Sequence, residues 1–199
     1  MIDNEPKPKN KFNLWEYTAN DELRPALNGV FHDPVHKVAV ATNAHILVAD
    51  SASFDEKSVD KNSVNWSGMR PVDKYGNFIP AKFPNYARIL EKSDGYESFT
   101  IEIDEIAALI AKHKAWLKTN GYTSKSEYVP QCVYKIKDTY FDIYLLHKFL
   151  KATNGNIEVN TQNDKGIYLS ETRSAIMMPI FVSEPKLQKI DGMLLTGVD

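Results

Sequence analysis

The sequence contains a single cysteine, Cys132, among its 199 residues. One thiol cannot form an intrachain disulfide or a cysteine-ligated zinc site, which excludes a secreted disulfide scaffold. Long apolar runs are also missing, since no stretch approaches the about eighteen residues that a membrane span requires. The opening residues "MIDNEPKPKNKF" are polar where a signal peptide needs an apolar segment. We therefore expect a cytoplasmic protein with no membrane contact.

An excess of charge of either sign is absent as well. The formal net charge is -2, so any contact with nucleic acid would need a local basic face. The candidates are lysines on two predicted helices: Lys112, Lys114, Lys118, Lys148 and Lys151. Such lysines can contact duplex phosphates, but they also suit the C-terminal ends of helices and favour solubility. The sequence leaves both interpretations open.

Catalytic and phosphate-binding motifs are not found. The chain lacks G-x-S-x-G, G-x-x-x-x-G-K-[ST] and G-x-G-x-x-G. His32 and His36 are four residues apart, but Pro34 lies between them, so they flank a turn and do not share a helix face. Cys132 lies in a predicted strand and fits a small core residue. We expect no enzyme, no cofactor and no metal site.

The distribution of residue types suggests three regions. Residues 1–11 alternate prolines and charges and are expected to form a disordered leader. Residues 12–182 are expected to form the folded domain, with the polar, breaker-rich stretch 51–80 as a loop or insertion. Residues 183–199 form a tail, which could cap the core, hang free or occupy a groove. The simplest expectation is that the tail packs locally or is disordered, and does not occupy a groove.

Periodicity predicts an α+β fold with antiparallel sheets and few helices. Capping residues and apolar spacing predict helices at 104–118 and 143–152, the second ended by Asn154-Gly155. The order strand, helix, three strands is predicted for the C-terminal half. The strands are expected at 12–17, 26–32, 37–49, 98–103, 132–137, 156–161, 166–170 and 174–182.

Four segments, in order, resemble one family. The stretch "RPALNGVFHDPVHKVAVATNAHIL" is similar to the R-x-x-L-N-G-[MV] and V-A-T-D-G-H-R-L motifs of the bacterial sliding clamp, the beta subunit of DNA polymerase III. "KFPNYARIL" is similar to the clamp's F-P-D-Y-x-R-V-[LI] segment. "FDIYLLHKFLKATNGNIEV" and "AIMMPI" resemble the opening and the close of its last half-domain. The resemblance implies a shortened clamp-like protein built from strand-helix-three-strand units.

The resemblance also implies a function and a site. Clamps bind short peptide motifs of DNA polymerases and repair proteins, sometimes as rings around duplex DNA, so a homo-oligomer is compatible with it. Carried across position by position, the peptide-binding set is Leu27, Thr42, Ala44, His45, Ile46, Leu47, Pro84, Arg88, Ile89, Ile176 and Met178. Ala44 replaces a glycine of the family and Ile46 replaces an arginine. Without the resemblance, most of these residues would be assigned to ordinary core.

Overall fold

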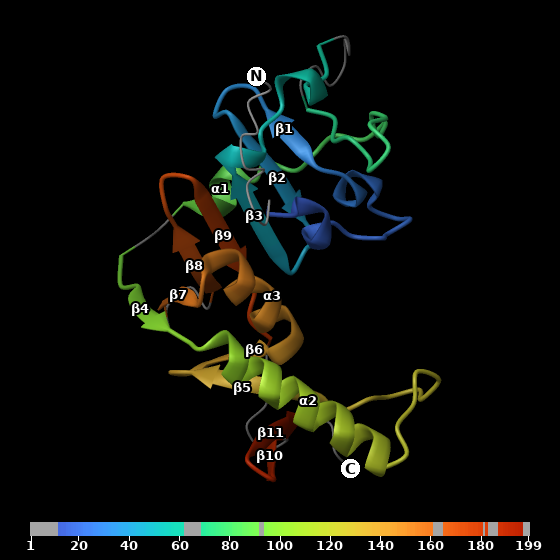
Figure 1. Ribbon diagram of the computed structural model, residues 1–199, viewed down its shortest axis with the longest axis vertical. Coiled ribbons are helices and arrows are strands. Elements are labelled where there is room, and N and C mark those ends of the chain that lie inside the picture. The colour runs from blue at the N-terminus through green and yellow to red at the C-terminus, as the bar shows by residue number, and fades with distance from the viewer. Residues whose placement is uncertain are drawn as a thin grey trace, which may run out of the picture.

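The fold consists of two antiparallel sheets in the computed structural model, which describes residues 12–61, 69–91, 94–160, 165–180, 182 and 187–196 (Figure 1). The larger sheet has seven strands in the order β1-β2-β3-β9-β8-β7-β4. Their bounds are Phe31–Asp33 (β1), Val38–Thr42 (β2), Ile46–Asp50 (β3), Glu97–Thr100 (β4), Asn156–Asn160 (β7), Lys165–Leu169 (β8) and Arg173–Met177 (β9). The smaller sheet has the order β10-β11-β5-β6, with bounds Gln131–Ile136 (β5), Thr139–Asp142 (β6), Leu187–Ile190 (β10) and Met193–Thr196 (β11).

Three α-helices occur in the described residues: α1 (Ala87–Leu90), α2 (Ile103–Thr119) and α3 (Ile143–Thr153). Local chemistry sets both ends of α3. The Asp142 side chain accepts hydrogen bonds from the amides of Tyr144 and Leu145, and Asn154 closes the helix in the left-handed conformation. The α+β fold class is confirmed, and the predicted order of strand 132–137, helix and three strands is found as β5, α3, β7, β8 and β9, with an unpredicted strand, β6, between β5 and α3.

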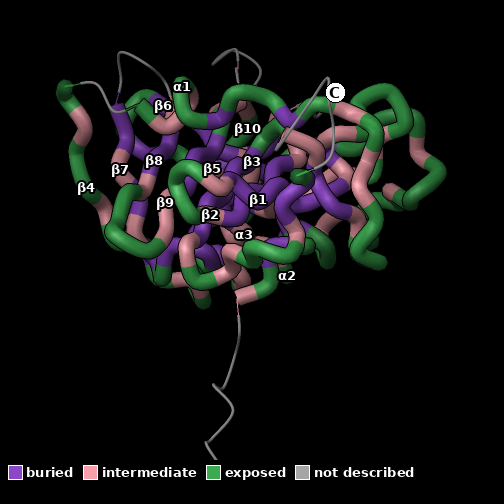
Figure 2. The backbone as a smooth tube through the Cα atoms, turned by 90° about the horizontal axis from the view of Figure 1, so that it is seen from above, coloured by how far each residue is buried: buried purple, intermediate pink, exposed green. Residues whose placement is uncertain are grey.

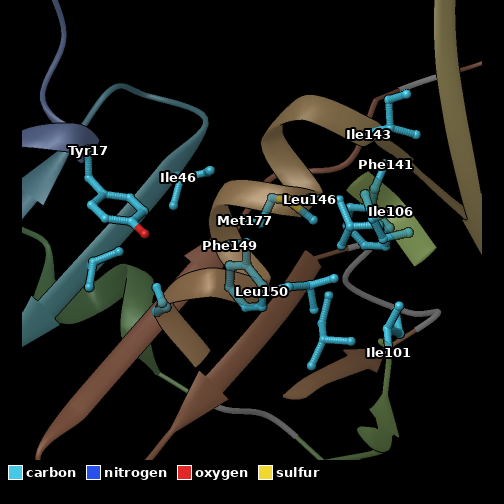
Figure 3. Packing of buried hydrophobic residues seen from close by; sticks show 14 of the residues in the cluster. Tyr17, Ile46, Ile101, Ile106, Phe141, Ile143, Leu146, Phe149, Leu150 and Met177 are labelled. Carbon is cyan, nitrogen blue, oxygen red and sulfur yellow. The ribbon is translucent and has the colours of Figure 1, made fainter. Parts of the chain in front are cut away.

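The main core lies where α3 covers the larger sheet (Figure 3). Ile143, Leu146, Phe149 and Leu150 are each fully buried on the inner face of α3. Burying such a side chain contributes about 1.5–3 kcal/mol. The helix α2 packs beside α3 and contributes Ile106 and His113. Figure 2 shows the buried residues gathered in the middle of the molecule and the exposed ones around it.

Two predicted strands near the N-terminus were wrong or misplaced. Residues 12–17 contain a 3₁₀ turn, Leu14–Tyr17, because the Asn13 side chain accepts the Trp15 amide and starts a turn. Tyr17 is buried and its hydroxyl donates to the Lys148 carbonyl at 3.0 Å. The predicted strand 26–32 is a 3₁₀ turn, Pro25–Asn28, followed by β1.

The predicted single strand 37–49 is two strands, β2 and β3, joined by a turn at residues 43–45. Both strands are nearly buried on both faces, so their small and apolar residues run on without an obvious break. That pattern conceals the turn. The resulting β2–β3 pair is antiparallel, with Thr42 opposite Leu47.

The tail region contains a hairpin that the sequence did not predict. Strands β10 and β11 meet at Asp191-Gly192, both with positive φ, and β11 pairs with β5. Met193 and Leu195 are buried in the main core. Strand β6 was also missed. The leader 1–11 lies outside the described residues.

Candidate functional site

The turn between β2 and β3 is tightly organised by its own side chains. The Thr42 hydroxyl donates to the Ile46 carbonyl at 2.8 Å and accepts the Ala44 amide at 3.1 Å. Asn43 Oδ1 accepts the amides of His45 and Ile46, at 3.0 and 2.8 Å. Such Asx and Thr contacts satisfy backbone groups that would otherwise be unpaired in a tight turn. The turn therefore holds His45 at a fixed, exposed position.

Ala44 has a φ of +74°, in the left-handed region that disfavours residues with a Cβ. We expect Ala44→Gly to raise the free energy of unfolding by about 1 kcal/mol, because glycine adopts this conformation without strain. The same change at Ala111, exposed on α2, should instead lower it by about 1 kcal/mol through lost helix propensity. Urea unfolding of both variants measures this. Equal losses at the two positions would contradict a strained Ala44.

Beside this turn, strands β3 and β9 form an apolar floor. Leu47 lies opposite Ile176 in the β3–β9 register, and the two are on the same face of the sheet. Just beyond β9, the Met178 amide donates to the His45 carbonyl at 2.8 Å. Leu47 and Ile176 are buried, whereas Met178 is 39% exposed. Met178 is therefore the part of this floor that a partner can most readily cover.

Two further segments wall this floor to form one cavity, which we call the apolar groove. Leu27 comes from the 3₁₀ turn Pro25–Asn28, and Ile89 comes from α1. The groove has a volume of about 430 Å³, within the range of small-ligand sites. Its lining is chiefly apolar: Arg24, Pro25, Ala26, Leu27, Thr42, Ala44, His45, Ile46, Leu47, Ala81, Lys82, Pro84, Ile89, Ile176 and Met178.

The structure brings together ten of the eleven peptide-binding residues predicted from the sequence. Those in the lining are Leu27, Thr42, Ala44, His45, Ile46, Leu47, Pro84, Ile89, Ile176 and Met178. Arg88 is exposed on α1 and is not in the lining, because its neighbour Ile89 occupies that side of the helix. The sequence missed Arg24, Pro25, Ala26, Ala81 and Lys82. Arg24, Pro25, Ala26 and Lys82 lie within quoted motifs and Ala81 directly precedes one, so the motifs themselves were the available signal.

The rim of the apolar groove carries two cations. Arg24 donates from Nε to Asp21 Oδ2 at 2.7 Å, and that hydrogen bond holds the pKa of Asp21 below its usual value. Asp21 Oδ1 also accepts the amides of Leu23 and Arg24, which fixes the loop that leads into the groove. Lys82 supplies the second cation. The rim is therefore still basic, although Ile46 stands where the family has an arginine.

Polar contacts anchor the short helix α1 at both ends. The Tyr86 hydroxyl, just before α1, donates to Asp33 Oδ2 at 2.6 Å. Burial and this carboxylate raise the pKa of Tyr86. Burial opposes ionisation of Asp33, but hydrogen bonds from His36 and Tyr86 outweigh it and keep the Asp33 pKa low. At the other end, Lys165 Nζ donates to the carbonyls of Ile89 and Glu91, at 3.2 and 3.1 Å.

The five helix lysines do not form one basic face. Lys112 and Lys114 are two residues apart on α2, so their side chains diverge by about 160° around the axis. Lys112 Nζ donates to the Asp191 carbonyl. Lys114 lies 5.9 Å from the centre of the Tyr144 ring and Lys148 Nζ donates to the Glu16 carbonyl. Lys118 and Lys151 are exposed. This arrangement gives the duplex-binding hypothesis no support beyond the sequence.

The two turn histidines have different partners. The amide of Asp55 donates to His32 Nδ1 at 3.0 Å, and burial lowers the His32 pKa. His36 Nδ1 lies 2.7 Å from Asp33 Oδ2. Among the residues that the structure describes, no group of three His, Cys, Asp or Glu side chains is placed to hold a metal ion. Within the same ranges, no helix is long and apolar enough to cross a membrane.

Solved structures with a similar fold are bacterial sliding clamps. The C. crescentus beta sliding clamp has a TM-score of 0.55 and 14% identity, over 84% of this chain and 61% of that one. The Thermotoga maritima DNA polymerase III beta subunit has a TM-score of 0.50 and 17% identity, over 84% and 61%. The Helicobacter pylori beta clamp bound to a DNA ligase peptide has a TM-score of 0.50 and 15% identity, over 85% and 61%.

These similarities show that the chain has the sliding-clamp fold. The chain spans about six tenths of the length of the clamps that it matches. No protein-family model and no curated protein sequence matches it.

Proposed function

We propose that this chain is a non-enzymatic, clamp-like protein that binds short peptide segments of DNA polymerases or repair proteins in the apolar groove. One observation carries the proposal: ten residues that resemble a peptide-binding site, at positions 27, 42, 44–47, 84, 89, 176 and 178, line one cavity. Solved structures with the same fold include the Helicobacter pylori beta clamp bound to a DNA ligase peptide.

The chemistry of the apolar groove suits an extended peptide with apolar anchors. Leu27, Leu47 and Ile176 close the floor of the groove. The partly exposed Ile89 and Met178 offer apolar surface against which leucine and phenylalanine side chains can be buried. Met178 is unbranched and flexible, so it can pack against anchors of different shape. The hydrogen-bonded turn at His45 provides a rigid edge, which reduces the ordering cost of binding.

The experiment is a titration of the full chain with a short peptide that carries Gln and terminal Leu-Phe anchors. Amide chemical shifts of Thr42, His45 and Met178 should move with the peptide concentration, and a peptide with both anchors replaced by Ala should move none of them. Unchanged shifts at these three residues, at millimolar peptide, would overturn the proposal.

Met178→Ala should weaken binding of the anchored peptide about three- to tenfold, because the truncation removes apolar area that the peptide would cover. Leu169→Ala is a matched control, since Leu169 is 38% exposed and Met178 is 39% exposed, but Leu169 lies outside the groove lining. Isothermal titration calorimetry of both variants gives the comparison. A similar loss at Leu169 would indicate that the peptide binds elsewhere.

Lys165→Met should weaken peptide binding about threefold, because it removes both hydrogen bonds that hold the C-terminal end of α1 and so loosens the Ile89 wall. Lys148→Met is the control, since Lys148 also donates to a backbone carbonyl, that of Glu16. Lys165→Arg should restore most of the affinity. If Lys148→Met weakened binding as much as Lys165→Met, the effect would be one of general stability.

A further inference from the structure

We propose that the apolar groove selects acidic peptides, in which carboxylates flank the apolar anchors. This inference rests on the proposed function and goes beyond it by naming the charge of the partner segment. It comes from the ionisable side chains that line the groove and from the bonds that those side chains already make.

The lining of the apolar groove contains two permanent cations, Arg24 and Lys82, and no carboxylate. Lys82 is exposed and makes no hydrogen bond or ion pair within the described part of the chain. Arg24 uses Nε for Asp21, and its side chain is 56% exposed. A guanidinium has four further N–H donors, so Arg24 can still bind a ligand carboxylate. Among the described residues, Lys82 is therefore the unpaired cation of the rim, and Arg24 keeps donors for a partner although Asp21 offsets its charge.

A second groove on the other side of α1 has the opposite character. It has a volume of about 270 Å³ and its lining includes Glu91 and Glu171, which are exposed. Its cation Arg173 is paired with Asp50 at 3.0 Å and its side chain is 21% exposed, against 56% for Arg24, so Arg173 is the less accessible of the two. The chain as a whole carries a net charge of -2. The basic rim is thus a local property of the apolar groove, and it does not reflect a generally basic surface.

Exposed charge pairs are weak and screened by salt, which sets the size of the expected effect. Two flanking carboxylates should tighten binding about three- to fivefold at low ionic strength relative to neutral amides. The ratio of the two affinities should approach one near 1 M salt, where the Debye length falls to about 3 Å. Affinity due to the apolar anchors should change much less with salt.

The test uses the full chain and three peptides with the same Gln and Leu-Phe anchors, flanked on each side by Asp, Asn or Lys. Calorimetry or fluorescence anisotropy at about 50 mM and about 500 mM salt should give the affinity order Asp, then Asn, then Lys, with the spread reduced at high salt. Lys82→Gln should roughly halve the ratio of Asp to Asn affinities. Lys118→Gln, which removes an exposed lysine of α2, should leave that ratio unchanged.

The possible outcomes separate the two proposals. If the three peptides bind with equal affinity, the charge preference is overturned and the peptide-binding function stands. If Lys118→Gln lowers the ratio as much as Lys82→Gln, the preference comes from overall charge and the assignment to the groove rim is overturned. If no peptide binds at millimolar concentration, both proposals fail.

Discussion

Replacing Leu195 with alanine is expected to lower the free energy of unfolding by about 3 kcal/mol. Leu195 is fully buried on β11, where it lies opposite Cys132 of β5. Removing three carbons from a closed core costs the lost transfer free energy and leaves a cavity, for a typical total of about 2–5 kcal/mol. The measurement is urea-induced unfolding, followed by far-ultraviolet circular dichroism, with the slope checked for two-state behaviour.

The neighbouring residue gives the control for Leu195. Leu194 has the same side chain on the same strand, but it points to the other face of the sheet and is only partly buried. Leu194→Ala should therefore cost clearly less than Leu195→Ala. Equal costs would mean that the β10–β11 hairpin does not close the core in solution. Peptide binding should survive in both variants at temperatures where they remain folded.

Replacing Asp50 with asparagine is expected to lower the free energy of unfolding by about 3 kcal/mol. Asp50 Oδ1 pairs with Arg173 Nε at 3.0 Å, and their side chains are 1% and 21% exposed. Removing one partner of such a pair leaves a poorly solvated charge, which costs about 3–5 kcal/mol when burial is complete. Arg173 Nη1 also donates to the Ala152 carbonyl, so the guanidinium cannot simply turn to solvent.

A double variant tests whether the cost at Asp50 comes from the unpaired charge. Adding Arg173→Met to Asp50→Asn should recover part of the lost stability, because no charge is then left without a partner. Glu56→Gln is the control, since Glu56 pairs with Lys37 at the surface and its loss should hardly change the unfolding midpoint. A double variant less stable than Asp50→Asn would show that the arginine contributes mainly through packing on Phe12, whose ring centre lies 3.6 Å from the guanidinium.

Helix α3 and the strands around it were predictable because their signals are local. Asp142 caps the helix, apolar residues recur at helical spacing, and Asn154-Gly155 stops it. The groove floor was predictable for a different reason: the resemblance supplied contacts between segments far apart in the chain. Neither periodicity nor composition could have placed Leu47 opposite Ile176.

The failures have identifiable physical causes. The turn at Asn43-Ala44 lacks glycine, and Asn43 alone was too weak a turn signal to mark a break between two doubly buried strands. Arg88 and Ile89 differ by about 100° around a one-turn helix, and the sequence does not fix how that helix is rotated. Asp191-Gly192 is a hairpin signal, but a hairpin signal does not identify the strand with which the hairpin will pair.

That pairing has a consequence for how the chain folds during synthesis. Strand β5 receives its neighbour β11 only when residues about sixty positions later have been made, since Cys132 pairs with Leu195. At about 5–20 residues per second, β5 waits roughly 3–12 s with one edge uncovered. An uncovered edge strand invites pairing with another chain. The same holds in the larger sheet, where β3 waits for β9, about 120 positions later, so both sheets present an open strand edge while the chain is being made.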